Sequence, residues 1–206
     1  VDAGIFFEFI PADKFFDENP PRLSLKDVEL GVNYAIILNT NAGLWGYNIG
    51  DTVEFTSIKP YRIIVSGRIK HFISAFGEHV IGKEVEAAMI KACGTTKAEV
   101  VEFTVAPQID GGEGGLPYHE WFVEFGKEPN DMADFSKIID DEMQSQNVYY
   151  KDLIEGNILK PIVLCPLKKD GFIDYMKSIG KLGGQNKVPR LSNDRKIADQ
   201  LSKLRA

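Results

Sequence analysis

The first residue whose type and setting could do chemistry is Asp51, a carboxylate at the end of a turn-rich run. Residues 43–51 read Gly-Leu-Trp-Gly-Tyr-Asn-Ile-Gly-Asp and stand just before a stretch with the composition of a strand. A carboxylate held at the entry of a strand can accept hydrogen bonds from two neighbouring hydroxyls of a sugar, as acidic residues do for riboses elsewhere. Glycine and aspartate are also ordinary turn residues, so a tight turn that binds nothing is the competing interpretation.

A second cluster, residues 66–86, contains the cation Arg68 and three glycines that frame a hairpin leading into a helix. Arg68 could reach a phosphate or sugar oxygen, although a solvated surface charge is the commonest fate of an arginine. His79 lies in the same cluster and has no His or Cys partner at the spacing of metal ligands. We therefore expect a solvated or hydrogen-bonded histidine, and no metal site.

The third candidate is Lys187, which follows a run rich in Gly and Asn over residues 178–186. Val188 and Pro189 come directly after it, and a proline stiffens the chain. This order predicts a mobile loop that carries a cation, followed by a fixed stretch of chain at Val188 and Pro189. Loops of this kind often hold functional residues. A solvated lysine is the competing interpretation, and the spacing alone does not prove catalysis.

Short strands must position the first of these candidates. Apolar or β-branched runs at residues 4–10, 32–38, 52–57 and 61–66 are separated by Gly, Asn or Pro. Pro11 cannot donate to a strand ladder and marks the end of the first run. Four strands at close spacing without a helix predict a small antiparallel β subdomain over residues 1–66.

The pattern changes after residue 66, where helices and strands alternate. A helix is predicted at 82–93 with Gly94 as its C-cap, and a long β-hairpin at 98–106 and 118–125 around the Gly-rich loop 107–117. A helix at 134–143, a strand at 159–165, a helix at 171–179 and a terminal helix at 193–204 with Asn193 as N-cap follow. Residues 67–206 therefore read as an α+β domain, which gives the whole chain the α+β class.

Composition excludes some partners. The chain of 206 residues carries 24 Lys and Arg against 30 Asp and Glu, a formal charge of −6. A basic nucleic-acid binder or a binder of acidic membranes is therefore not the default interpretation. No apolar run approaches the length of a membrane span.

Cysteine usage and the first residues bear on the setting of the protein. Cys93 and Cys165 are far apart in apolar stretches, as buried thiols are, and this favours a reducing, cytoplasmic location. The chain opens with Val1 and has neither an initiator Met nor a signal-peptide pattern. We expect it to be a piece of a longer protein.

The three clusters together resemble a known set in order and approximate spacing. Tyr47, Gly50 and Asp51 resemble the Tyr-x-x-Gly-Asp element of the acyl-adenylate-forming superfamily, and residues 67–86 resemble its hinge and the start of its mobile C-terminal domain. More narrowly, residues 6–11, the Gly-Leu-Trp at 43–45 and the Gln-Asn-Lys-Val-Pro-Arg at 185–190 are similar to the auxin-responsive acyl-acid amido synthetases, the Gretchen Hagen family.

The resemblance implies a two-step ligase that adenylates a carboxylic acid with ATP and then joins it to an amino acid. It implies that Asp51 holds the ribose hydroxyls, that Tyr47 and Arg68 lie in the same ATP site, and that Lys187 reaches the reacting oxygens. Phe6 and Phe9 would lie near the acyl substrate, although core filling is the more common role of aromatic strand residues.

The resemblance also implies parts that this chain does not hold. The family's phosphate loop and the element that contributes to its Mg²⁺ site lie upstream, so we expect a preceding domain of the same polypeptide to supply them. The metal ligand would lie there and not among these residues. The chain would comprise the end of the adenylation domain and a mobile C-terminal lid, and would be inactive alone. Gly46 and Asn48 stand where plant members usually have arginines.

Two other interpretations stay open. The chain could be a non-catalytic partner-binding or regulatory module that keeps the lid fold and uses the Gly-rich loop at 110–115. It could also be a decayed homologue without activity, as the residues Gly46 and Asn48 would allow.

Overall fold

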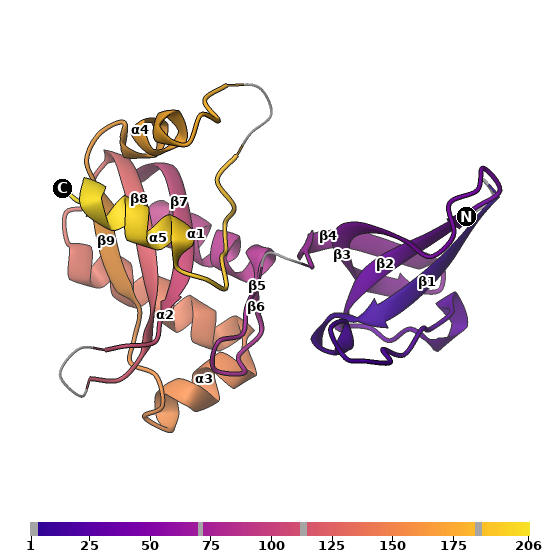
Figure 1. Ribbon diagram of the computed structural model, residues 1–206. Helices are drawn as coiled ribbons and strands as arrows, with labels where there is room; N and C mark the ends of the chain where they lie inside the picture. Colours follow the sequence, from indigo (N-terminus) through magenta and orange to yellow (C-terminus); the bar gives the residue numbers. More distant parts are fainter. Residues whose placement is uncertain (1–3, 70–71, 112–114, 184–186) are drawn as a thin grey trace. The chain divides into compact units, whose positions relative to one another are not determined.

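The structure is a computed structural model that describes residues 4–69, 72–111, 115–183 and 187–206 (Figure 1). The chain divides into two compact units, residues 1–70 and residues 71–206, called unit 1 and unit 2 below. The domain boundary expected after residue 66 stays a prediction. Ile69 lies past that boundary and still belongs to unit 1, because its backbone N donates to Gly50 O at 2.9 Å.

Unit 1 is the small antiparallel β subdomain that the strand pattern predicts. Its four strands are β1 (Ile5–Pro11), β2 (Asn33–Thr40), β3 (Tyr47–Ile58) and β4 (Tyr61–Arg68), in the order β1-β2-β3-β4. Two 3₁₀ turns, Ala12–Lys14 and Leu25–Asp27, follow β1. All three strand pairs are antiparallel.

The apolar residues of unit 1 form two clusters. One is centred on Phe9, Tyr34 and Phe55, whose rings meet edge to face with centroids 5.1 to 6.2 Å apart. The other contains Ile37 and Ile69. Residues that lie opposite each other across a strand pair share a face of the sheet, and successive residues alternate between faces. The alternation along β1, with Phe9 in one cluster and Ile10 in the other, therefore gives the sheet an apolar cluster on each face.

Unit 2 is an α+β domain, so the predicted fold class is confirmed. Its elements are β5 (Phe72–Ile73), β6 (Val80–Ile81), α1 (Gly82–Thr96), β7 (Glu99–Gln108), β8 (Tyr118–Lys127), α2 (Met132–Gln146), α3 (Val148–Glu155), β9 (Val163–Leu167), α4 (Gly171–Ser178), α5 (Lys196–Leu201) and a final 3₁₀ turn, Ser202–Leu204.

The main sheet of unit 2 has the order β7-β8-β9, with β7 antiparallel and β9 parallel to β8. Figure 1 shows α5 across one face of this sheet and α1 and α2 on the other. A large core cluster lies under α1, α2 and α3 and includes Trp121 and Phe135. A smaller cluster around Phe122 and Leu201 lies under α4 and α5. Each face of the sheet is thus covered by its own helices.

Several predicted boundaries were wrong. β3 begins at Tyr47 and not after Asp51, because its first residues pair with β2. α1 continues past Gly94 and ends at Thr96, and Lys97, with a φ of 61°, is its left-handed cap. The last helix begins at Lys196, since the side chain of Asn193 accepts a hydrogen bond from Ser74 N instead of capping it. Helix α3 was not predicted at all.

Candidate functional site

Asp51 and Arg68 meet across the β3–β4 pair of unit 1. Their Cα atoms are register partners. Arg68 Nε donates to Asp51 Oδ1 at 2.9 Å, and the side chains are 57% and 31% exposed. The register of the two strands thus joins two residues that the sequence marked separately.

Asn48 and Gly50 shape the backbone before Asp51. Gly50 has a φ of 85°, a left-handed conformation that costs glycine little. Asn48 Oδ1 accepts a hydrogen bond from Gly50 N at 2.8 Å, an Asx-type turn. On the other side, Gly50 O accepts from Ile69 N at 2.9 Å. The bend that directs the Asp51 carboxylate is therefore held from both sides.

The Asp51 carboxylate keeps one oxygen available. Oδ1 is engaged by Arg68, while Oδ2 accepts no hydrogen bond from the residues that the structure describes. An ionised carboxylate is an acceptor with about four lone-pair sites, so it can take hydroxyl donors while it stays paired with a guanidinium. The pair can therefore bind a neutral, hydroxyl-bearing group.

Tyr47 lies on the same strand, at its first residue, and its side chain is 48% exposed. Tyr47 and Asp51 are four residues apart on β3, and the register of β3 with β2 shifts between Asn48 and Thr52. A ligand bound along this part of β3 could contact both side chains.

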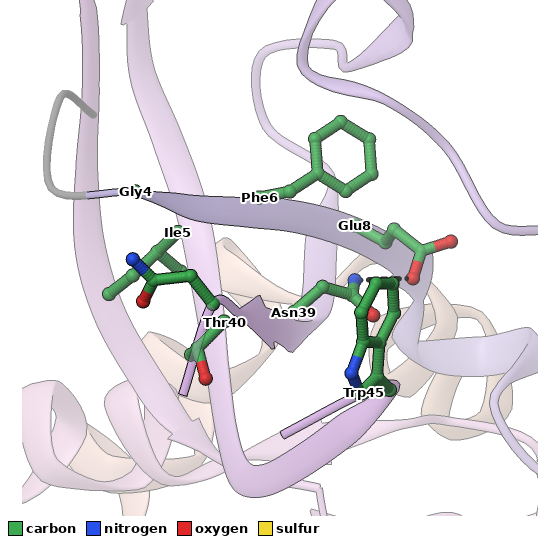
Figure 2. A pocket seen from close by; sticks show the side chains of 8 residues that line it. Gly4, Ile5, Phe6, Glu8, Asn39, Thr40 and Trp45 are labelled. Atoms are coloured by element: carbon green, nitrogen blue, oxygen red, sulfur yellow. Dashed lines mark hydrogen bonds between the residues drawn. The ribbon is translucent and has the colours of Figure 1, made fainter. Parts of the chain in front are cut away.

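Phe6 lines an open cleft at the end of the sheet where β1 begins and β2 ends. The cleft has a volume of about 710 Å³. Figure 2 shows Phe6 and Trp45 at this cleft, with Asn39 hydrogen-bonded to Glu8. The lining residues are Gly4, Ile5, Phe6, Glu8, Asn39, Thr40, Asn41 and Trp45. The surface of the cleft is mostly apolar, with Glu8, Asn39, Thr40 and Asn41 as its polar groups, and the cleft is open to solvent.

Phe9 does not share this cleft. Its side chain is 3% exposed and packs against Tyr34 and Phe55 in the core of unit 1. The ring thus fills the core, as aromatic strand residues more commonly do, and a place for Phe9 near the acyl substrate stays a prediction. The alternation of side chains along β1 explains the difference, because Phe6 and Phe9 are an odd number of residues apart.

Lys187 lies in unit 2, and its side chain is exposed. It makes no hydrogen bond or ion pair with any other residue in the described ranges. Directly after it, Val188 is buried under α4 and α5, and Pro189 O accepts from Thr104 Oγ1 at 2.7 Å. The lysine thus extends from a chain that is fixed to β7. Residues 184–186, which the resemblance included in the same motif, lie outside the described residues.

Arg190 fastens the same segment further. Its guanidinium pairs with Glu86 and Glu102, and its Cζ lies 4.5 Å from the centroid of the Phe103 ring. Backbone bonds from Val105 N to Arg190 O and from Ser192 N to Val105 O run alongside β7. These contacts confirm that the stretch of chain directly after Lys187 is fixed, as predicted.

Comparison with known proteins gives the family. The GH3 family central domain matches residues 1–68, and the GH3 family C-terminal domain matches residues 83–196. The chain belongs to the GH3 family. This confirms the resemblance read from the sequence, and the gap between the two matches contains the division between the two units.

Two curated plant relatives of this GH3 chain are amido synthetases by name. Indole-3-acetic acid-amido synthetase GH3.3 of Arabidopsis thaliana is 25% identical over 197 residues, which are 90% of this chain and 33% of the relative. Indole-3-acetic acid-amido synthetase GH3.10 of the same plant is 27% identical over 219 residues, 96% of this chain and 36% of the relative. The chain spans about a third of the length of these relatives.

Solved structures agree on the fold. The GH3.15 acyl acid amido synthetase matches with a TM-score of 0.71 at 20% identity, covering 98% of this chain and 37% of that one. A second structure, AtGH3.15 in complex with 2,4-DB, matches with a TM-score of 0.68 at 18% identity, with the same coverage. The fold of this GH3 chain is therefore that of the corresponding part of these proteins.

The GH3 chain also contains a buried pair that sequence reasoning missed. His119 Nε2 lies 2.8 Å from Glu78 Oε1, and neither side chain has exposed area. Burial by itself raises the pKa of Glu78, but the hydrogen bond and charge of His119 and two backbone hydrogen bonds outweigh it and lower the pKa. The Gly-Glu of residues 77–78 was visible in the sequence, whereas no local signal marks His119 as its partner.

A second buried carboxylate, Glu120, holds the C-terminal segment of this GH3 chain. Arg195 and Arg205 donate to its two oxygens at 2.8 and 2.6 Å. Cys165 Sγ also donates to Glu120, and burial followed by the Glu120 charge raises the pKa of this thiol to about 12. The thiol stays protonated at neutral pH, so this cluster is structural.

In the described parts of the chain, no group of three or more His, Cys, Asp and Glu side chains could hold a metal ion, and His79 belongs to no such group. Nor does any helix in those parts combine the length and the hydrophobicity that crossing a membrane requires. Cys93 and Cys165 form no disulfide.

Proposed function

We propose that this GH3 chain is part of an ATP-dependent acyl-acid amido synthetase, which adenylates a carboxylic acid and joins it to an amino acid. The observation that carries the proposal is the Asp51–Arg68 pair, with its open carboxylate oxygen, in a chain whose relatives are named amido synthetases. Because the chain spans a third of those relatives, the activity is proposed for the whole protein.

The proposed roles follow from the chemistry of each side chain. Asp51 Oδ2 accepts hydrogen bonds from the ribose hydroxyls of ATP, and Arg68 keeps the carboxylate in place while it lies beside the ribose. Tyr47 lines the same site from the start of β3. These residues bind and orient the nucleotide, and none of them has to move a proton.

In the first step, a carboxylate oxygen of the acid attacks the α-phosphorus of ATP, and the bond to the β-phosphate oxygen breaks to release pyrophosphate. In the second step, the amine of an amino acid attacks the acyl carbon, AMP leaves with the electron pair of the broken bond, and the amine loses a proton. Negative charge develops on the oxygens around phosphorus in the first step. Lys187, extended from its fixed base, supplies the positive charge that stabilises it.

Mg²⁺ would neutralise the phosphates of ATP, and its ligands are proposed to lie in a preceding part of the polypeptide. The carboxylic acid and the amino acid are the proposed small-molecule partners, with Phe6 in the open cleft as a candidate neighbour of the acid. We propose a cytoplasmic location, in keeping with two cysteines that form no disulfide.

The test is the exchange of labelled pyrophosphate into ATP by the full-length protein in the presence of carboxylic acids. A positioned donor to a developing oxyanion contributes about 3–4 kcal/mol, so Lys187→Ala should lower the exchange rate at least a hundredfold. Lys181→Ala removes an exposed lysine of the same segment and should leave the rate within about twofold. An unchanged rate in Lys187→Ala would refute the role of Lys187.

A further inference from the structure

The β5–β6 hairpin is too short to hold itself. Each strand contributes two residues, Phe72–Ile73 and Val80–Ile81. A two-stranded hairpin of this kind is at best marginally stable in water. Ile73 and Val80 anchor one side chain of each strand, since both are fully buried in the core under α1 and α2. The hairpin as a whole, residues 72–81, needs further contacts to stay closed.

Ser74 N donates to Asn193 Oδ1 at 3.1 Å, and Glu78 supplies three further contacts. Its Oε2 accepts from Phe76 N at 2.9 Å within the loop, and its Oε1 is 2.8 Å from His119 Nε2. Its backbone O accepts from Asn147 Nδ2 at 2.9 Å. Because the lowered pKa keeps the carboxylate ionised, Oε1 can only accept, so Nε2 is the donor.

The partners of Glu78 belong to the body of unit 2. His119 lies on β8, and its ring stacks on Tyr150 of α3 at a centroid distance of 5.2 Å and on Phe76 at 6.3 Å. Asn147 caps α3 by accepting from Tyr150 N. A hairpin that would be loose alone is therefore bound to both the sheet and α3.

This hairpin is also the first element of unit 2 after the connection from unit 1. Ile69 is fixed in the core of unit 1 and hydrogen-bonded to Gly50. Only residues 70 and 71 stand between it and the start of β5 at Phe72. If the hairpin opened as far as the start of α1 at Gly82, Ile73 and Val80 would leave the core and residues 70–81 would all join the connection.

We propose that Glu78, His119 and Asn147 are positioning residues that lock the β5–β6 hairpin onto unit 2 and so keep the connection between the two units short. With the hairpin locked, Ile69 and Phe72 can be at most about 10 Å apart; with it open, Ile69 and Gly82 could be about 45 Å apart. The effective concentration of one unit near the other falls by roughly tenfold over this change in length.

The inference extends to activity only through the proposed function. Asp51 lies in unit 1 and Lys187 in unit 2, so a step that uses both depends on the connection between the units. The lock itself does not depend on that function, because it is made of contacts inside unit 2.

Hydrogen exchange of the 206-residue chain tests the lock. In Glu78→Ala, the amides of residues 74–81 should exchange at least tenfold faster, while those of β7 and β8 keep their rates. Glu124→Ala is the matched control, since this buried carboxylate accepts from Asp170 N and Phe172 N at the start of α4. It should speed exchange in α4 and leave the hairpin protected. Unchanged exchange in 74–81, or a rise shared by all of unit 2, would overturn the proposal.

A conservative variant separates the hydrogen bond from general packing. His119→Gln keeps a donor for Glu78, so it should restore most of the protection of residues 74–81 that His119→Ala loses. If both variants lose the same protection, the hydrogen bond is not the anchor and the proposal fails.

Small-angle X-ray scattering tests the length of the connection. Ten Gly and Ser residues inserted between residues 70 and 71 lengthen the connection while the lock stays intact. Both this insertion and Glu78→Ala should increase the maximum dimension of the chain in solution relative to the unmodified protein. An increase with the insertion but not with Glu78→Ala would overturn the proposal, as would no increase with either.

The full-length protein then tests the consequence for activity. Pyrophosphate exchange should fall roughly tenfold in both Glu78→Ala and the insertion variant, and equal rates in all three proteins would contradict the role in positioning. If the unmodified protein shows no exchange with any acid, the proposed function fails. The hydrogen-exchange and scattering results still decide the lock in that case.

Discussion

Asp51 combines two properties that a nucleotide-binding carboxylate needs. Arg68 fixes the orientation of the carboxylate through Oδ1, and no described residue occupies Oδ2. The bend at Gly50, held by Asn48, lies directly before this carboxylate in the chain. Asn48 stands at a position where plant members of the family usually have an arginine. Here its side chain takes part in shaping the site.

The first prediction concerns Asp51 alone. Asp51→Asn removes the charge that strengthens hydrogen bonds to ribose hydroxyls, and such bonds contribute about 1.5 kcal/mol. The KM for ATP in the exchange reaction of the full-length protein should therefore rise about tenfold, with kcat within about threefold. Asp17→Asn, an exposed acid of the same unit, is the control. An unchanged KM for ATP in Asp51→Asn would rule out the ribose role.

The stability that Glu78 contributes should depend on pH. The pKa of Glu78 is lowered in the folded chain, so its contribution to stability is fully present above its unfolded pKa of about 4.3 and is lost as the pH falls through the lower folded value. His119 is the ionisable group in direct contact with Glu78, and Asp140, Tyr150 and Glu84 are the others bonded to the same network through Asn147 and α3.

Urea unfolding of unit 2, followed by the fluorescence of buried Trp121, measures this effect. The free energy of unfolding should fall as the pH is lowered below about 4. In Glu78→Gln the decrease on acidification should be smaller. An equal decrease in both proteins would show that Glu78 is not the responsible group.

The elements show what the sequence could and could not predict. Strong periodicity gave α1, α2 and the β7–β8 hairpin, because long amphipathic or alternating segments carry their own signal. Helix α3 is short, and its start is marked only by the Asn147 cap. The extra length of β3 comes from its pairing with β2 at one end and β4 along the rest, which is a tertiary effect.

The candidate site, too, could be predicted from the sequence only in part. Asp51, Arg68 and Lys187 were each predictable from residue type and from their resemblance to a family pattern. The Asp51–Arg68 contact was not, because it depends on the β3–β4 register, which bulges shift at two places. The Glu78–His119 pair joins residues 41 positions apart, so only the folded chain reveals it. Sequence reasoning thus finds candidate residues, and register decides which of them meet.

The whole chain consists of two units with separate cores. The clusters around Phe55 and Ile37 lie in unit 1, and those around Trp121 and Phe122 lie in unit 2. Domains with their own cores unfold as separate cooperative units. We therefore predict two thermal transitions for the 206-residue chain by calorimetry.

A variant that damages one core assigns the transitions. Phe55→Ala should lower the first unit's melting temperature and leave the other transition within about 1 °C, since removing a buried Phe costs about 3–5 kcal/mol. A single transition that shifts as a whole would show that the two cores are coupled.

The central claim, that the full-length protein forms acyl-adenylates, has one direct test. The protein is incubated with ATP, Mg²⁺ and a panel of aromatic and aliphatic carboxylic acids, and acyl-AMP is detected by mass spectrometry together with pyrophosphate exchange. We expect at least one acid to give acyl-AMP and acid-dependent exchange, and an added amino acid to convert the acyl-AMP to an amide. A folded protein that binds ATP but forms no acyl-AMP with any acid of the panel would contradict the claim.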